Sequence, residues 1–380
     1  MNIPFYARHS TVLDAGQLLS CLEGPLATDG LFTKKALGLL SRLYPDRDGR
    51  AMLTSSCSTA LETALELCGL APGGEVLLPS YNFPSAANAV LKAGGVPVFC
   101  DIDPDTQNLS LRDAAAKITA RTRAVIPVQY AGISCPMDGL LALSKEAGLT
   151  VVEDAAQAID ACYRGIPLGA LGDFGCVSFH YTKNISCGEG GLLLCKSRKD
   201  CEKARCYRVH GTNRDAFLNG ECDRYTWVCP GSSTAVSELC AALLSSQLSC
   251  LGQITETRRR RLRDYLEFLK PLEEQGAARL MAVPDYASPN GHIFYLRFES
   301  QRLREYIQKV LAEHGVDAKT HYVPLHLSLM GAKLGYRPED LPESLACYET
   351  LLRLPIHTQL TRDQALQIAE IIIKGLRFYG

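Results

Sequence analysis

The sequence predicts an α/β fold, with a large domain built on a mostly parallel sheet over residues 1–252 and a smaller α+β domain over residues 253–380. The first observation is size, because 380 residues with 47% hydrophobic composition suffice for one large core and a second, smaller one. The second is that short apolar runs alternate with helical patterns from Met52 onward, which is typical of parallel strands joined by crossover helices. The third is that this alternation stops near Leu194.

The elements of the large domain follow from the spacing of their apolar residues. The first 50 residues predict a polar lead-in with one helix at 33–43. Apolar residues at helical spacing predict helices, and compact runs rich in Val, Ile and Leu predict buried strands. The expected elements are a helix at 58–67, a strand at 75–78, a helix at 86–92, a strand at 96–99, a helix at 111–118, a strand at 124–128, a helix at 137–147 and a strand at 150–153.

The second half of the chain is less regular. A charged helix at 199–207 gives way to an irregular polar stretch at 210–233, and a loop of this length in a compact domain usually carries function or an interface. Beyond it, the pattern changes to that of an α+β domain. The expected elements are helices at 236–251 and 255–269, a strand at 293–296, a helix at 303–313, an extended piece at 319–323 and a closing helix at 362–378.

The balance of charge excludes two classes of partner. Forty basic and 41 acidic residues leave a net charge of -1, so no overall field recruits nucleic acid or an anionic membrane. The run Arg258-Arg259-Arg260-Arg261 is the one basic block, and we interpret it as the solvated face of a helix, with a polyanion site as the alternative. No apolar run approaches the roughly 20 residues that span a bilayer.

The 16 cysteines predict neither a disulfide framework nor a metal site. No Cys-x-x-Cys motif occurs, and many cysteines lie in apolar runs, where a thiol behaves as a small hydrophobic side chain. No charged, apolar and small-residue leader precedes Pro4. We therefore expect a cytoplasmic protein without a bound metal.

Polar residues that follow the apolar runs mark the expected site, because ligands of an open parallel sheet bind at the carboxyl ends of its strands. Ser56-Cys57-Ser58 opens a helix, where free amides and the helix dipole can hold a phosphate. A plain hydroxyl cap is the alternative. Asp154 follows a strand and is placed to meet a cationic ring nitrogen, although it too could cap a helix.

The ends of two further strands supply the remaining contacts that the expected ligand needs. Phe83 could lie over a flat ring, although such a residue is more often packed in a core. Ser178 could bind phosphate, and Lys183, in the turn after the same strand, could form a Schiff base with an aldehyde if it loses its proton. A loop lysine taken alone is more often a solvated charge. Together these groups describe a phosphorylated aromatic aldehyde with a basic ring nitrogen, which is pyridoxal 5'-phosphate.

The sequence also resembles a known family. The resemblance lies in Ser56-Cys57-Ser58, Pro79-Ser80-Tyr81-Asn82-Phe83, Val151-Val152-Glu153-Asp154-Ala155-Ala156-Gln157 and Ser178-Phe179-His180-Tyr181-Thr182-Lys183-Asn184, and extends from Pro4 to the last helix. In order and spacing these segments resemble the DegT/DnrJ/EryC1/StrS family of nucleotide-sugar aminotransferases. The resemblance implies a fold-type I, pyridoxal-phosphate-dependent homodimer with its active site near the interface.

The resemblance also implies roles for single residues. Lys183 would form the Schiff base with pyridoxal phosphate and move a proton during catalysis, and Asp154 would keep the ring nitrogen protonated. Gln157 would contact the ring hydroxyl, Phe83 would stack on the ring, and Glu189 would be structural. The remaining expected contacts are Ser56, Cys57, Ser58, Ser178 and Ser233 on the cofactor, with His180 in support and His321 and His326 on the substrate side.

The implied reaction transfers an amino group from glutamate to the 4-keto group of a nucleotide-linked 6-deoxyhexose. A 3-keto sugar aminotransferase, a non-aminating sugar enzyme of the same cofactor class and a non-catalytic sugar-nucleotide sensor remain as alternatives. The chain departs from the family pattern in three places. Many members have glycine at the position of Cys57, and many have asparagine and arginine at the positions of Ser233 and Ala235.

Overall fold

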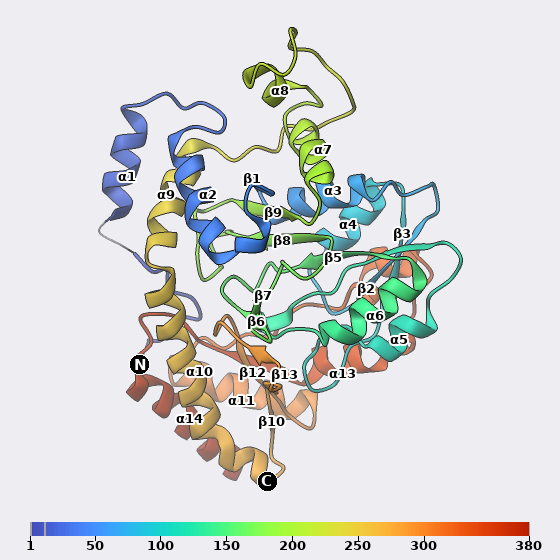
Figure 1. Ribbon diagram of the computed structural model, residues 1–380. Coiled ribbons are helices and arrows are strands. Elements are labelled where there is room, and N and C mark those ends of the chain that lie inside the picture. The colour runs from blue at the N-terminus through green and yellow to red at the C-terminus, as the bar shows by residue number, and fades with distance from the viewer. Residues whose placement is uncertain (1, 11–12, 380) are drawn as a thin grey trace.

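A seven-stranded sheet forms the centre of the larger part of the molecule in the computed structural model, which describes residues 2–10 and 13–379 (Figure 1). The strand order is β1-β9-β8-β5-β4-β2-β3, and β9 alone runs antiparallel to its neighbours within this described sheet. The mostly parallel α/β architecture is therefore confirmed. The strands are β1 (Ala51–Thr54), β2 (Glu75–Pro79), β3 (Val96–Cys100), β4 (Thr122–Val125), β5 (Thr150–Asp154), β8 (Phe174–Ser178) and β9 (Gly191–Cys195).

Both faces of this sheet are buried. Along β2, Val76 and Leu78 belong to one hydrophobic cluster and Leu77 to another, because successive side chains point to opposite faces. Helices α3, α4 and α7 cover one face, and α2, α6 and α9 contribute to the cluster on the other. The helices of this part are α1 (Leu13–Leu22), α2 (Leu31–Leu43), α3 (Cys57–Leu67), α4 (Ser85–Lys92), α5 (Leu111–Ala116), α6 (Met137–Ala147), α7 (Arg198–Arg208), α8 (Arg214–Leu218) and α9 (Glu238–Ser249).

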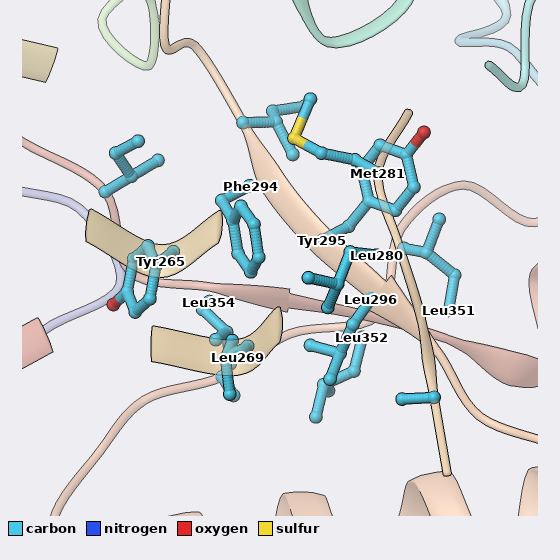
Figure 2. Packing of buried hydrophobic residues seen from close by; sticks show 14 of the residues in the cluster. Tyr265, Leu269, Leu280, Met281, Phe294, Tyr295, Leu296, Leu351, Leu352 and Leu354 are labelled. Carbon is cyan, nitrogen blue, oxygen red and sulfur yellow. The ribbon is translucent and has the colours of Figure 1, made fainter. Parts of the chain in front are cut away.

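A second, three-stranded antiparallel sheet with the order β10-β12-β13 lies below the first in Figure 1. Its core contains Tyr265 and Phe294, whose rings stack with centroids 4.7 Å apart, surrounded by leucines of the strands (Figure 2). The elements are α10 (Leu251–Glu274), β10 (Arg279–Leu280), β12 (Phe294–Arg297), α11 (Gln301–Glu313), α12 (Leu329–Lys333), α13 (Pro342–Thr350), β13 (Leu351–Leu354) and α14 (Arg362–Arg377).

Contacts between the two parts cross the domain division that we propose at residues 252 and 253. That division falls in the first turn of α10, and Ile3 forms a β-bridge with Val316, so the first residues pack beside the second sheet. A small third sheet also joins the parts, since β11 (Ala287–Ser288) pairs with β6 (Cys162–Tyr163), which pairs with β7 (Ile166–Pro167).

Several boundaries differ from the sequence prediction. The strand expected at 124–128 ends its regular pairing at Val125, although Val128 still bridges to Asp154. Helix α1 and strand β13 were not predicted, and the stretch at 210–233 contains the short helix α8, which projects from the body in Figure 1. Within the described ranges, no helix combines the length and the apolar character needed to cross a membrane.

Candidate active site

A cavity of about 530 Å³ opens at the carboxyl ends of the parallel strands and is walled on its other side by the second sheet. It brings together nearly all of the residues predicted from the sequence. Those lining it are Ser56, Cys57, Ser58, Phe83, Asp154, Gln157, Ser178, His180, Lys183 and His321.

The N-terminus of α3 forms one end of the cavity. Ser56 is the N-cap of this helix: its Oγ accepts from the Thr59 backbone N–H at 3.1 Å, and Thr59 Oγ1 accepts in return from the Ser56 N–H. Ser58 Oγ lies 2.6 Å from Ser85 Oγ, which fixes that hydroxyl at the rim. Ser56 is therefore a helix cap, and the cavity also meets the positive end of the helix dipole, which favours an anion.

Gly191 explains why the glycine turn after Lys183 is needed here. A Cβ on Gly191 would stand 2.4 Å from the backbone carbonyl carbon of Ser56 and 2.5 Å from the amide nitrogen of Cys57. Only glycine lets β9 pass this close to the start of α3. Burial raises the pKa of the Cys57 thiol well above its usual range, so this side chain stays neutral beside an anion.

Asp154 ends β5 with its carboxylate in the cavity. Its Oδ1 accepts from the Ala156 N–H at 3.1 Å. Burial raises the pKa of this carboxyl, while the Ala156 hydrogen bond and the charge of Lys183 oppose that rise. A cationic ring nitrogen bound beside Asp154 would further stabilise the carboxylate.

Lys183 lies in the turn after β8, where its backbone N–H donates to His180 O at 2.9 Å. Burial lowers the pKa of its amine, and the negative charge of Asp154 partly restores it. The next residue anchors the turn to the second domain, since Asn184 Nδ2 donates to Asn290 O at 3.2 Å and Asn184 Oδ1 lies 2.9 Å from His292 Nδ1. Lys183 and Asp154 thus converge on one cavity, and burial makes the amine of Lys183 easier to deprotonate than that of an exposed lysine.

The other predicted contacts have defined partners. Gln157 Oε1 accepts from the Ala131 N–H at 2.7 Å, and its Nε2 donates to the Tyr322 hydroxyl at 3.0 Å. Phe83 is exposed on the cavity wall, with its ring 6.1 Å from that of Tyr322. His180 Nε2 lies 3.6 Å from Glu189 Oε1 at the rim.

Two predicted residues lie outside the cavity. His326 is buried elsewhere, with Nδ1 2.7 Å from Ser80 Oγ and Nε2 3.3 Å from Pro338 O, so its role is to fix the 79–83 segment. Ser233 is exposed and pairs with Val209 in the 210–233 stretch. His321, by contrast, lines the cavity, and its Nδ1 lies 2.7 Å from the Tyr130 hydroxyl.

Sequence reasoning missed the wall that the N-terminal segment and the second domain contribute. It also treated the basic block as a solvated helix face, which is wrong for Arg258, because that side chain is only 6% exposed and lines the cavity. An arginine within the apolar run Leu351–Leu354 was a usable signal for Arg353. The missed lining residues include Phe5, Tyr6, Arg258, His292, Tyr322 and Arg353.

Comparison with known proteins shows to which family the chain belongs. The profile of the DegT/DnrJ/EryC1/StrS aminotransferase family matches residues 46–373. The chain belongs to this family. It is similar to the pleiotropic regulatory protein of Geobacillus stearothermophilus, with 33% identity over 325 residues that cover 85% of this chain and 84% of the relative. It is also similar to the spore coat polysaccharide biosynthesis protein SpsC of Bacillus subtilis, with 31% identity over 337 residues and 86% of each chain covered.

A solved structure supports the same assignment. Spr1654 from Streptococcus pneumoniae, in its PMP form, superposes with a TM-score of 0.91 at 25% identity, covering 99% of each chain, and the same protein is also solved in its PLP form. The cofactor of this aminotransferase is therefore pyridoxal phosphate.

The residues of the cavity fit this cofactor. The α3 N-terminus with Ser178 suits the phosphate, Asp154 suits the ring nitrogen, and Lys183 suits the aldehyde. When bound, the cofactor supplies an electron sink for the carbon that gains or loses nitrogen. Across the described ranges, no group of three His, Cys, Asp or Glu side chains is arranged to hold a metal ion.

Proposed function

We propose that this aminotransferase acts on a nucleotide-linked sugar. The reaction transfers the amino group of glutamate to the 4-keto group of dTDP-4-keto-6-deoxy-D-glucose and yields dTDP-4-amino-4,6-dideoxygalactose. The observation that carries the proposal is the convergence of Lys183 and Asp154 with the α3 N-terminus in one cavity. The choice of sugar rests on the likeness of segments 128–132 and 211–227 to the sugar 4-transaminases.

The residues of this chain divide the work as follows. Lys183 Nζ, with its pKa lowered by burial, takes the proton that leaves the carbon bearing nitrogen and returns a proton on the other side of the transfer. The Asp154 carboxylate holds the proton of the ring nitrogen. His321 and His180 line the substrate side of the cavity, and Phe83 covers its face.

The product would supply a cell-surface polysaccharide such as lipopolysaccharide or enterobacterial common antigen. The name of the Bacillus subtilis relative, a spore coat polysaccharide biosynthesis protein, supports this class of destination. The work would take place in the cytoplasm, in a homodimer whose active site lies near the subunit interface. Ser233 would then reach the cofactor phosphate of the partner subunit from its exposed position.

The test offers the purified protein glutamate with dTDP- and UDP-linked 4-keto and 3-keto sugars, and identifies any aminated product by NMR. Lys183→Ala should abolish amination and the yellow colour of the lysine-bound cofactor, because no other amine replaces Lys183 Nζ. Lys199→Ala, which removes an exposed lysine on α7, is the matched control. A Lys183→Ala protein that still turns over would refute the assignment.

A sugar-nucleotide sensor is the second candidate, and the name of the pleiotropic regulatory relative is the observation that favours it. A non-aminating sugar enzyme remains a third. One measurement separates these two from the first: glutamate should convert the bound cofactor to its amine form in an aminotransferase, whereas a sensor or a non-aminating enzyme would leave its spectrum unchanged.

A further inference from the structure

Two cavity-lining arginines have no acidic partner among the residues that the structure describes. Arg258 donates from Nε to Gly291 O and from Nη2 to His292 O, each at 3.0 Å. Arg353 donates from Nε and Nη2 to Thr320 O at 3.1 and 2.7 Å. These backbone carbonyls orient the two guanidinium groups but do not neutralise them, and N–H donors remain on each group.

These two residues are distinguished by carrying an uncompensated charge at the cavity, since Arg47, which is also buried and bound by backbone carbonyls, does not line it. Elsewhere, Arg208 pairs with Asp29 at 2.7 Å and Arg297 with Glu343 at 2.6 Å. Over the described part of the chain, neither Arg258 nor Arg353 forms an ion pair with a carboxylate. Burial lowers the pKa of Arg258 to about 10, which reflects the cost of holding its charge away from water. A buried charge of this kind is stabilised when an anion binds beside it.

Both arginines line the same cavity as Lys183, and Arg258 also lines a smaller hollow together with it. The charge of Arg353 lowers the pKa of Lys183, and the charges of Lys183, Arg258 and Arg353 all depress the pKa of the His292 imidazole. His292 and the three cations thus line one cavity. The phosphate of the cofactor has a separate cradle at the N-terminus of α3.

The location of the two arginines in the cavity of Lys183 indicates which of the two anionic substrates they would bind. A nucleotide sugar carries its diphosphate on C1, across the sugar ring from the 4-keto carbon that reacts. An amino acid carries its α-carboxylate on the carbon that bears the amine, and glutamate carries a second carboxylate three carbons away. Anions that must lie near Lys183 are therefore those of the amino donor.

We propose that Arg258 and Arg353 form a subsite for a dicarboxylic amino donor, each guanidinium binding one of its two carboxylates. The proposal rests on the proposed transaminase function and adds the residues that select its donor. A planar guanidinium suits this task because it can donate two parallel hydrogen bonds to one carboxylate. Hydrogen bonds to the carbonyls of Gly291, His292 and Thr320 hold the two guanidinium groups in position before the donor binds.

The first test measures binding without chemistry. Glutarate, a dicarboxylate without an amine, is titrated into the holoenzyme by calorimetry, with butyrate as the monocarboxylate probe. Arg258→Gln and Arg353→Gln should each weaken glutarate binding about 10- to 100-fold, the range for losing one charge-assisted contact. Arg260→Gln, on the exposed face of the same helix, is the matched control and should bind as the wild type does.

The second test follows conversion of the bound cofactor by glutamate and by 2-aminobutyrate. Replacing the arginine that holds the side-chain carboxylate should slow glutamate and leave 2-aminobutyrate unchanged, whereas replacing the other should slow both donors. Arg258→Lys and Arg353→Lys, which keep the charge without the planar fork, should recover part of the loss. Retention of bound cofactor, read from its colour, shows that each variant has folded.

The proposal is overturned if both glutamine variants bind glutarate and react with glutamate as the wild type does. It is also overturned if they lose only the half-reaction with the sugar, because the arginines would then serve the nucleotide diphosphate. Failure of the proposed function has a different signature, since the wild-type cofactor would then not respond to glutamate at all.

Discussion

At the residue scale, the neighbours Glu153 and Asp154 show how strand geometry divides two similar side chains. Glu153 accepts backbone N–H groups of Gly169, Leu171 and Gly172 at 2.7 to 3.0 Å, and thereby braces a loop on one face of the sheet. Asp154 ends the strand and presents its carboxylate to the cavity. Because successive strand residues point to opposite faces, one acid is structural and the other is free to serve the ligand.

The environment of Lys183 predicts a pH dependence. An ordinary lysine has a pKa of about 10.4. Burial lowers the pKa of the Lys183 amine, so its neutral, nucleophilic form appears at a lower pH than that of an ordinary lysine. The rate at which the apoprotein condenses with a simple aromatic aldehyde should therefore rise with pH. The midpoint of this rise should lie at a lower pH than the midpoint for Nα-acetyl-lysine, whose ε-amine is free in water. Borohydride trapping at each pH, followed by mass spectrometry, measures the modified Lys183.

Asp154→Asn provides the control for that interpretation. The carboxylate raises the pKa of Lys183, so its removal should move the midpoint to still lower pH. A midpoint at or above that of Nα-acetyl-lysine in the wild-type protein would contradict the burial argument, and an upward shift in Asp154→Asn would contradict the sign of the coupling.

Site residues on the large domain were predictable because each follows a strand whose apolar run is visible in the sequence. Asp154 and Lys183 come directly after such runs, and parallel strands bring their carboxyl ends to one edge. Arg258 and His292 could not be placed in this way. Their position depends on how α10 and the loop before β12 pack against the large domain, and no local pattern encodes that packing.

At the element scale, the antiparallel strand β9 was the feature that periodicity could not assign. The run Leu192-Leu193-Leu194 has the composition of any buried strand, and its direction follows only from the connection at 179–190 that carries Lys183 and from pairing with β8 and β1. The consequence is functional. The returning strand brings Gly191 against the start of α3, so the turn that carries Lys183 and the N-terminus of α3, where we propose that phosphate binds, are held together.

The start of α2 depends on a side chain from a distant helix. Glu238, at the first turn of α9, is 4% exposed and accepts from the backbone N–H groups of Phe32 at 2.8 Å and Thr33 at 3.0 Å, as well as from the Thr33 hydroxyl. Gly30 leaves no room for a Cβ, which would stand 2.8 Å from the Glu238 carboxylate. A helix whose own N-cap has no side-chain bond is thus capped from outside.

Glu238→Ala should destabilise the apoprotein by about 2 to 4 kcal/mol, because it leaves buried donors at the start of α2 without an acceptor. Thermal and urea unfolding of the apoprotein measure the loss, and removing the exposed Glu66 of α3 is the matched control. Unfolding of Glu238→Ala at the same midpoint as Glu66→Ala would show that water replaces the carboxylate at little cost.

At the scale of the whole molecule, hydrogen bonds from one asparagine join the parts on either side of the proposed domain division, beside the cavity. Asn290 Nδ2 donates to Gln157 O at 3.0 Å and to Ile159 O at 2.8 Å, and Asn290 O accepts from Asn184. A Cβ on Gly132 would stand 2.2 Å from Asn290 Oδ1, so the backbone at Gly132 packs too closely against Asn290 for any larger residue. The relative position of the two cavity walls is therefore fixed through groups adjacent to Gln157 and Lys183.

The 210–233 stretch has the features of a subunit interface. It projects from the body around α8 (Figure 1), and it contains Trp227, which is 72% exposed, together with further exposed apolar side chains. Monomeric proteins rarely display such apolar surface, and a second copy of the chain would cover it. The exposed members are Phe217, Leu218, Tyr225, Trp227 and Val228.

Trp227→Asp should therefore dissociate the homodimer that we propose. Losing the burial of a large apolar side chain costs about 1.5 to 3 kcal/mol, and two-fold symmetry counts it twice, so the dimer Kd should rise at least about a hundredfold. Sedimentation velocity measures the change, and Leu329→Asp, at an exposed position on α12, is the matched control. Amination should fall with the dimer fraction and recover at high protein concentration, because Ser233 would reach the cofactor only across the interface. A Trp227→Asp protein that stays dimeric would show that the 210–233 stretch is not the interface, and a monomer with full activity would place the active site within a single chain.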